Sequence, residues 1–287
     1  MVDNTQSRTH VIDHSAENVK RAAQALRDGK LVSFPTETVF GLGANAKDPD
    51  ACLQIFKSKG RPLTDPLIVH VDCVERALEL ISDNEKVLTT FKELAAHYWP
   101  GPLTLVTKAN LDLIPMLITA NTGYIGIRVP NHPVAQELLL ESGVPVAAPS
   151  ANKFGHVSPT RAEHVYNDFH KDSEVLILDG GACNFGIEST VLKITDAELL
   201  IIRKGGVSQS NLEQHLGILT HQFTIKQLGK QSKEETVNCE APGQFLRHYS
   251  PDIVSYLFDG QYKSTKDMEL SDAVLIDFGS EFAALKD

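Results

Sequence analysis

The residues of this chain with the clearest chemical potential are suited to binding phosphate. The stretch Pro35 to Gly43 carries two hydroxyls, a carboxylate and two glycines, and it follows directly on the apolar run Leu31 to Phe34. Glycines allow backbone N–H groups to approach an anion closely. Lys59 and Arg61 then supply the fixed positive charge that phosphate recognition needs. The spacing predicts an anion-binding pocket.

The order of these residues excludes the common nucleotide motifs. No G-x-x-x-x-G-K-[ST] sequence is present, and Gly41-Leu42-Gly43 is followed by Ala44-Asn45-Ala46, which does not complete G-x-G-x-x-G. A G-x-S-x-G elbow, a Ser-His-Asp ordering, an H-E-x-x-H motif and an EF-hand loop are also missing. A metal held by a dedicated protein cage is therefore not expected. The remaining cations and hydroxyls suit reactions that depend on positioning and charge neutralisation.

Arg128 and His70 are candidates on predicted strands. Alternation over Tyr124 to Val129 puts Arg128 on the same face as Gly126, which would leave room for a ligand beside a charge. An edge-strand arginine that faces water is an equal alternative for this segment. His70 is separated by the same alternation from the apolar face of its strand, although a lone histidine is more often structural.

Small polar side chains at expected strand ends and helix starts form a second group of candidates. Ser150 and Asn152 follow a predicted strand, and Ser158 precedes a predicted helix, so that they could bind phosphate or ribose oxygens. Capping alone is the alternative, and we expect Ser158 to cap its helix in either case. Ser189 and Arg203 add another hydroxyl and another cation.

Helix and strand signals alternate through most of the first two hundred residues and would position these candidates. One helix is expected from the N-cap Ser15 to Gly29, and another from Asp48 and Pro49 to Gly60. Further helices are expected near 74–81, 87–98 and 133–140 and after Ser158. The expected strands are Leu31 to Phe34, Leu67 to Val71, Leu103 to Thr107, Tyr124 to Val129, Val144 to Ala148, Val175 to Leu178, Thr190 to Ile194 and Leu199 to Ile202. This pattern predicts a mixed α/β sheet.

Length and composition limit the function classes. The 287 residues are 42% apolar and 22% charged, as in an ordinary globular protein with a sizeable core. A net charge of -10 argues against broad electrostatic binding to nucleic acid or to anionic membranes. The four cysteines show no C-x-x-C or Cys/His spacing. With no run long enough to span a membrane and no signal-peptide pattern at the N-terminus, we expect a cytoplasmic protein.

Three regions are predicted along the chain. Residues 1–207 form the main domain, and residues 208–250 form a linker that contains the unusual run Arg247-His248-Tyr249. Residues 251–287 carry two strand-like runs but are too few to bury a core alone.

Taken in order, the motifs of the main domain resemble the YrdC family of threonylcarbamoyl-AMP synthases. Each motif is weak alone, but nine in this order are specific, and they cover nearly all of residues 15–207. The segment from Ala241 to Pro251 is similar to the linker of the long, two-domain form. The motifs are Pro35 to Gly43, Lys59 to Pro62, Pro66 to His70, Trp99 to Thr104, Gly126 to Pro130, Pro149 to Asn152, Ser158 to Thr160, Ser189 to Val191 and Ile202 to Gly205.

This resemblance implies a fold and an activity. The fold would be an α/β, YrdC-like twisted mixed sheet with helices around a deep concave cavity, followed by a linker and a small Rossmann-like C-terminal remnant. The enzyme would be a nucleotidyltransferase that joins L-threonine, bicarbonate or CO2, and ATP into L-threonylcarbamoyladenylate and releases pyrophosphate. The product would reach a downstream tRNA threonylcarbamoyl transferase that modifies adenosine 37 in tRNAs reading ANN codons.

The resemblance also implies roles for individual residues. Threonine would be held by Thr36, His70, Arg128 and Ser189, with Arg128 pairing its carboxylate. Mg2+ would bridge the ATP phosphates without a metal site of the protein's own. Lys59, Arg61 and Arg203 would act in catalysis, and ATP would be held by Lys59, Arg61, Ser150, Asn152, Ser158, Arg203 and Tyr249, with Tyr249 and its neighbours closing over the nucleotide.

Three departures and two alternatives accompany this hypothesis. Phe40 stands where the family often has tyrosine, Gln244-Phe245-Leu246 differs from the common linker sequence, and the tail after Pro251 is much shorter than the family's usual C-terminal domain. One alternative is an RNA-binding, translation-associated module without chemistry, which the acidic balance disfavours. The other is carbamoyl transfer through carbamoyladenylate.

Overall fold

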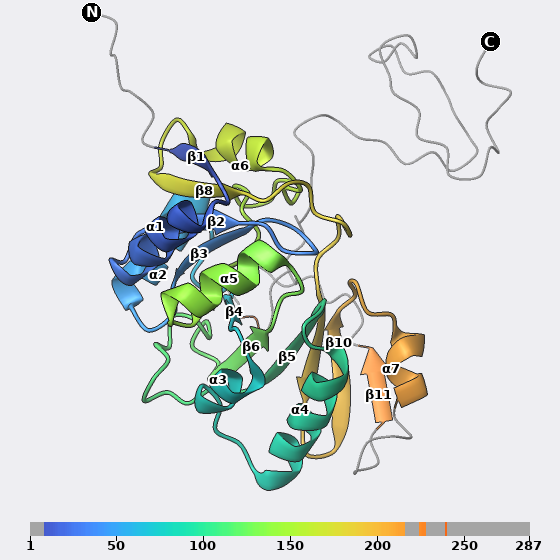
Figure 1. Cartoon of the computed structure of the whole chain (residues 1–287). Coiled ribbons are helices and arrows are strands. Elements are labelled where there is room, and N and C mark those ends of the chain that lie inside the picture. Colours follow the sequence, from blue (N-terminus) through green and yellow to red (C-terminus); the bar gives the residue numbers. More distant parts are fainter. Residues whose placement is uncertain (1–8, 216–223, 228–238, 240–287) are drawn as a thin grey trace, which may run out of the picture. The chain divides into compact units, whose positions relative to one another are not determined.

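The computed structural model describes residues 9–215, 224–227 and 239, and this part of the chain forms one large sheet with helices around it (Figure 1). The sheet has eleven strands among the described residues, in the order β1-β8-β2-β3-β7-β4-β6-β5-β9-β10-β11. The strands are β1 (His10–Asp13), β2 (Leu31–Phe34), β3 (Gly41–Asn45), β4 (Ile68–His70), β5 (Leu103–Lys108), β6 (Tyr124–Arg128), β7 (Val146–Ala147), β8 (Val175–Asp179), β9 (Thr190–Ile194), β10 (Glu198–Arg203) and β11 (Thr224–Gln227).

This sheet contains both parallel and antiparallel strand pairs. Strand β4 is parallel to β6, and β5 is parallel to β9, whereas β6 pairs with β5 in the antiparallel sense. The helices are α1 (Ala16–Arg27), α2 (Pro49–Lys59), α3 (Val74–Glu79), α4 (Glu85–Tyr98), α5 (Pro133–Ser142), α6 (Ala162–Phe169) and α7 (Gln209–His215). The mixed α/β sheet predicted from the sequence is confirmed.

Local sequence signals account for both ends of α2. The Asp48 side chain accepts hydrogen bonds from the backbone N–H groups of Asp50 and Ala51, Pro49 takes the first helical position, and Gly60 ends α2 in the left-handed conformation. Ser15 takes the N-cap position of α1, as predicted. The prediction that Ser158 caps the next helix is wrong, because α6 begins after Arg161.

Three short strands were not predicted, and β3 is the most informative. Gly41 to Asn45 suggest a loop, but they pair with β2 on one side and β7 on the other. A Cβ atom at Gly43 would lie 2.8 Å from Val146 Cγ1 and 2.9 Å from Phe34 Cε1. Gly43 therefore lets two strands and a phenyl ring pack closely and does not offer its backbone to an anion.

Apolar faces of the helices and strands meet in the core. Helices α1 and α5 pack side by side against the β2 and β7 region (Figure 1), where the apolar side of α1, formed by Val19, Ala22, Ala23 and Leu26, is buried. On β6, Ile125 and Ile127 are buried in the largest core cluster, which leaves Gly126 and Arg128 for the opposite face. One face of the sheet is thus packed in the core, whereas the opposite face around β4 and β6 carries polar side chains such as Arg128.

The predicted linker and tail lie largely outside the described residues. Within 208–250, α7 forms a short helix and β11 adds a parallel strand to β10. Residues 251–287, and Tyr249 with them, are outside the described part, so the predicted domain limits stay a prediction.

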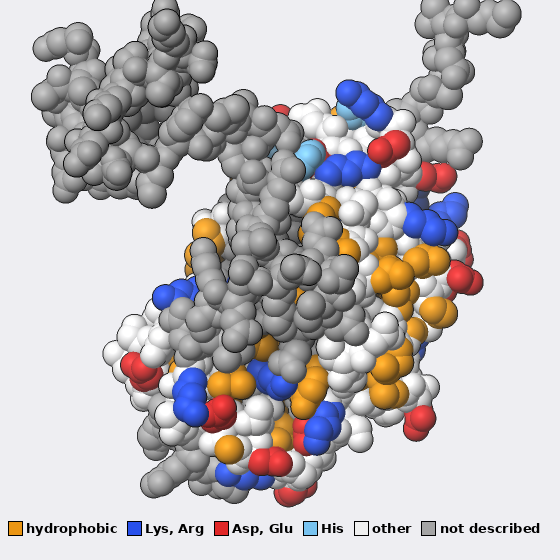
Figure 2. All heavy atoms as spheres, turned by 180° about the vertical axis from the view of Figure 1, so that it is seen from behind, with side chains coloured by type: hydrophobic (Ala, Val, Ile, Leu, Met, Phe, Trp, Pro, Cys, Tyr) orange, Lys and Arg blue, Asp and Glu red, His pale blue; other side chains and the backbone are white. Residues whose placement is uncertain are grey.

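The surface of the described residues carries both signs of charge. Figure 2, which shows the molecule from behind, has Lys and Arg side chains interspersed with Asp and Glu over the visible described surface. Among the described residues, no helix combines the length and the apolar content needed to cross a bilayer.

We expect Gly43→Ala to lower the free energy of unfolding by about 1–3 kcal/mol, because the added methyl group overpacks the contact with Val146 and Phe34. Urea denaturation measures this loss. Gly41→Ala in the same strand is the matched control, since its nearest contact would be a looser 3.2 Å to Ala148 Cβ. An equal or smaller loss for Gly43→Ala than for Gly41→Ala would contradict the packing role.

Candidate functional site

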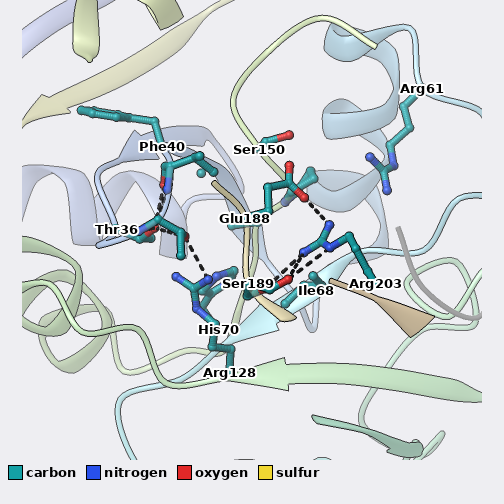
Figure 3. Close-up of a pocket in the computed structure, with 15 residues that line it drawn as sticks. Thr36, Phe40, Arg61, Ile68, His70, Arg128, Ser150, Glu188, Ser189 and Arg203 are labelled. Carbon is teal, nitrogen blue, oxygen red and sulfur yellow. Dashed lines mark hydrogen bonds and ion pairs between the residues drawn. The ribbon is translucent and has the colours of Figure 1, made fainter. Parts of the chain in front are cut away.

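The candidate site is built on the ends of β4 and β6. These strands are parallel and adjacent, and their register pairs His70 with Arg128. Strand β6 lies between β4 and β5 in the middle of the sheet, and Arg128 is only 3% exposed. The edge-strand interpretation of this arginine is therefore wrong, and the imidazole and guanidinium are fixed side by side (Figure 3).

Gly126 has a different role from the one predicted. A Cβ atom there would lie 3.1 Å from Thr104 Cγ2 and 3.6 Å from Ile68 Cγ1. The space beside Arg128 is thus taken by neighbouring side chains and does not receive a ligand. Ile68, on the same face of β4 as His70, lines the cavity instead.

The cavity above these strands encloses about 460 Å³ of empty space, part of which is open to solvent. Its walls combine three arginines, one imidazole, one carboxylate and several hydroxyls, together with a small apolar patch (Figure 3). It is lined by Thr36, Thr38, Val39, Phe40, Gly41, Arg61, Ile68, His70, Arg128, Ala148, Pro149, Ser150, Glu188, Ser189 and Arg203.

Arg128 is held by the turn that follows β2. Its Nη1 donates to Thr38 Oγ1 at 3.0 Å and its Nη2 to Glu37 Oε2 at 3.0 Å, and both partners of the ion pair are buried. Thr36 shapes this turn, because its hydroxyl accepts from the N–H groups of Thr38 and Val39 and donates to the Val39 carbonyl. Among the described residues, Arg128 Nε and Glu37 Oε1 have no hydrogen-bond partner.

The surroundings of His70 favour the neutral form of its imidazole. Burial lowers its pKa well below the usual value, and the positive charge of Arg128 acts in the same direction. Its Nδ1 is buried and has no hydrogen-bond partner among the described residues. A neutral ring can accept or donate one hydrogen bond without adding charge to a pocket that already holds three arginines.

A chain of hydrogen bonds runs from the strands to the other side of the cavity. Thr104 and Ser189 share a hydroxyl hydrogen bond of 2.8 Å. Arg203 donates from Nε and Nη2 to the Ser189 carbonyl and from Nη2 to its hydroxyl. The guanidinium also pairs with Glu188, which accepts from the Ser158 hydroxyl at 2.9 Å. The Ser158 hydroxyl thus serves this network and not a helix cap.

Arg61 lies at the third side of the cavity, just after α2. It forms a buried ion pair with Asp65 at 2.9 Å and donates to the carbonyls of Asp65 and Pro66. Burial raises the pKa of Asp65 to about 6, although Arg61 opposes the shift. The guanidinium is thereby fixed at the cavity wall.

Lys59 does not line the cavity but supports its edge. Its Nζ donates to the carbonyls of Ser150 at 2.6 Å and Asn152 at 2.5 Å, which holds the loop after β7 against the end of α2. Burial, followed by the charge of Arg61, lowers the pKa of Lys59 to about 7. The Asn152 Oδ1 atom is buried without a hydrogen-bond partner among the described residues.

The structure brings most of the predicted site residues together. Lys59 and Ser158 contact the lining residues Ser150 and Glu188 without lining the cavity themselves. Asn152 accepts from Lys59 through its carbonyl, and Tyr249 lies outside the described residues. Seven predicted residues line one cavity: Thr36, Arg61, His70, Arg128, Ser150, Ser189 and Arg203.

The sequence reasoning missed the carboxylates that pair with the arginines. Glu37 belongs to the stretch Pro35 to Gly43, and Glu188 directly precedes the predicted site residue Ser189. Their positions beside site residues were the available signal. Among the described residues, no group of three or more His, Cys, Asp or Glu side chains could hold a metal ion.

The chain is similar to known proteins in both sequence and structure. The Sua5/YciO/YrdC family model, described as "Telomere recombination", matches residues 24–205. The chain belongs to this family. It is 40% identical over 235 residues to a threonylcarbamoyl-AMP synthase of Bacillus subtilis, and 39% identical over 242 residues to one of Pyrococcus abyssi. These matches cover 81% and 84% of the chain, but only 64% and 68% of the relatives, so the chain spans about two thirds of their length.

Solved structures of the family agree with the fold. A P. abyssi Sua5 structure complexed with L-threonine superposes with a TM-score of 0.74 at 38% identity, covering 85% of this chain and 69% of that protein. Escherichia coli YciO superposes with a TM-score of 0.60 over 70% of this chain and 97% of its own, and at 22% identity it supports the fold alone. The resemblance predicted from the motifs is confirmed at the level of family and fold.

We expect Glu37→Gln to lower the free energy of unfolding by about 3–5 kcal/mol, because it leaves the buried Arg128 charge without its counterion. Chemical denaturation measures this loss. Asp172→Asn is the matched control, since Asp172 pairs with Lys153 at the surface and its removal should cost less than about 1 kcal/mol. Similar losses for the two variants would contradict the importance of the buried pair.

Proposed function

We propose that this chain synthesises L-threonylcarbamoyladenylate from L-threonine, bicarbonate or CO2, and ATP, with release of pyrophosphate. One observation carries the proposal: a single cavity joins the residues expected to hold threonine with two of the cations expected to hold ATP. The names of the B. subtilis and P. abyssi relatives, and the threonine in the P. abyssi structure, support it.

The amino acid would lie at the ends of β4 and β6. Arg128 would pair with its carboxylate through the guanidinium fork, which is already oriented by Glu37 and Thr38. Thr36, the neutral His70 and Ser189 would receive its polar groups. The aliphatic surface of Ile68 beside them suits an amino acid with a small apolar group.

The reaction would then depend on position and charge. The amine of threonine captures CO2 to give a carbamate, whose oxygen attacks the α-phosphorus of ATP while pyrophosphate leaves. Arg61 and Arg203 would offset the negative charge that accumulates on the phosphates, with Lys59 beneath Ser150 and Asn152. A charge-assisted contact of this kind is worth roughly 1.5–3 kcal/mol, or about ten- to a hundredfold in rate.

Mg2+ would accompany ATP. The carboxylates nearest the cavity are paired with arginines, and no group of three potential ligands exists among the described residues. This arrangement fits a Mg2+ ion held mainly by phosphate oxygens. It would neutralise phosphate charge, and the chain's own arginines would orient the phosphates.

The wider role is also part of the proposal. The adenylate would pass in the cytoplasm to a tRNA threonylcarbamoyl transferase that modifies adenosine 37. The linker would close over the nucleotide through Tyr249. The position of Cys239 supports this path, because this linker residue is buried and its N–H donates to the Thr64 carbonyl at 2.8 Å, next to Arg61 and Asp65.

The proposed reaction is tested by measuring phosphate release from ATP in the presence of Mg2+, bicarbonate and pyrophosphatase. We expect release to require both L-threonine and bicarbonate and to be much slower with L-serine. Arg128→Ala should raise the KM for threonine more than it changes kcat, because it removes the partner of the substrate carboxylate.

Two outcomes would contradict the proposal. Phosphate release that requires a carbamoyl donor in place of threonine and bicarbonate would favour carbamoyl transfer. ATP binding without any release would favour a binding role. Thermal melting of Arg128→Ala provides the control for folding, since this variant leaves Glu37 without its partner.

We also expect ATP binding to take up a proton above pH 7. Burial lowers the Lys59 pKa to about 7, so at pH 8.5 most molecules carry a neutral Lys59, whose ordinary pKa is 10.5. Nearby phosphates would raise this pKa again, so the affinity for ATP should fall as the pH rises from about 7 toward 10.5. Calorimetric titrations in buffers of different ionisation enthalpy measure the uptake.

Lys59→Arg is the control for this prediction, because a guanidinium stays charged throughout this pH range. The variant should bind ATP without the proton uptake. Equal uptake by both proteins would assign the proton to another group, and no uptake by the wild type at pH 8.5 would contradict the prediction.

A further inference from the structure

Each arginine that lines the cavity is paired with its own carboxylate. The distances are 2.9 Å for the first pair and 3.0 Å for the second, and the third pair is a close contact drawn in Figure 3. Such pairing lets charged side chains be buried before an anionic substrate arrives. The three pairs are Arg61–Asp65, Arg128–Glu37 and Arg203–Glu188.

The three carboxylates do not have equivalent positions. Asp65 is fully buried and Glu37 is 3% exposed, and neither lines the cavity. Both carboxylates contact their arginines from outside the cavity. Glu188 is the one carboxylate among the lining residues, so a ligand in the cavity would meet it directly.

Arg203 does not depend on Glu188 alone for its position. Its Nε and Nη2 donate to the carbonyl and hydroxyl of Ser189, whereas the ion pair with Glu188 is made through Nη1. If Glu188 moved away, Ser189 would still hold the guanidinium, and Nη1 would point at an incoming acceptor. Ser158 binds the other carboxylate oxygen of Glu188 at 2.9 Å.

The negative charge of Glu188 also affects Lys59 and Arg128. Burial lowers the pKa values of Lys59 and Arg128, and the negative charge of Glu188 partly offsets the shift in both. A polyphosphate bound against Arg61 and Arg203 would be repelled by this same carboxylate. Ligand phosphate and Glu188 are therefore competitors for one guanidinium.

We propose that Glu188 is an exchangeable counterion: a positioning residue that pairs with Arg203 and yields Nη1 to a phosphate oxygen of the bound nucleotide. Asp65 and Glu37 are permanent counterions that stay with their arginines. This inference rests on the proposed function, because it assumes that the cavity binds ATP.

The test compares ATP binding by the wild type, Glu188→Gln and Glu188→Ala, measured by calorimetry without threonine or bicarbonate and both with and without Mg2+. We expect both variants to bind ATP about tenfold more tightly or better, because no carboxylate competes for Arg203. A residue that only supports the local structure would weaken binding when replaced. Thermal melting shows that the variants are folded.

Asp168→Asn is the matched control. The charge of Asp168 also acts on Lys59, but its carboxylate accepts from the Lys153 backbone and does not contact Arg203. It changes the charge near the site by the same amount without freeing a guanidinium, so ATP affinity should change by less than about threefold.

Different failures have different meanings. A wild type that does not bind ATP would overturn the proposed function and, with it, the exchange. A wild type that binds ATP, with Glu188 variants that bind equally or more weakly, would overturn the exchange alone. Weaker binding by these variants only with Mg2+ would identify Glu188 as a metal ligand. An equal increase in ATP affinity for Asp168→Asn would mean that only the net charge near the site matters. Each of these outcomes contradicts the proposal.

Discussion

The structure depends on the placement of three guanidinium groups around one cavity in an acidic protein. An unpaired buried charge would cost several kcal/mol, so each arginine that lines the cavity needs a partner. The chain supplies three carboxylates from three different loops, after β2, after α2 and before β9. The path of these loops is therefore fixed by electrostatics as much as by packing.

The mixed sheet makes this placement possible. Parallel pairing of β4 and β6 brings His70 and Arg128 to the same level, and the turn after β2 reaches Arg128 with a hydroxyl and a carboxylate. Strand β3 passes close to the neighbouring β7 because Gly43 has no side chain. Tight packing of these strands thus holds the polar groups of the cavity in place, because a small shift of the strands would separate Arg128 from Glu37.

Much of this arrangement could be predicted from the sequence. Alternation along Tyr124 to Val129 correctly placed Arg128 opposite the apolar face, and the Asp48-Pro49 start of α2 placed Lys59 and Arg61 at its end. The order of the motifs identified the family. These features are local, or they depend on residue order, and both are written directly in the sequence.

The errors came from contacts between distant segments. Gly126 suggested space for a ligand, but Thr104 and Ile68 from neighbouring strands fill it. Ser158 suggested a helix cap, but its hydroxyl donates to Glu188, thirty residues further along the chain. Periodicity describes one segment at a time and cannot show which side chain of another strand or loop will occupy a neighbouring space.

Pairing each cation in advance also determines which ligands the cavity can accept. The arginines already have carboxylate partners, so an anionic ligand that leaves these pairs in place gains little binding free energy. An anionic ligand that replaces one of the carboxylates gains the most. Among the lining residues, that replacement is available only at Arg203, while Arg61 and Arg128 keep their counterions and offer their remaining donors. Under the proposed function, this difference would separate a nucleotide phosphate at Arg203 from an amino-acid carboxylate at Arg128, although an arginine would bind each of them.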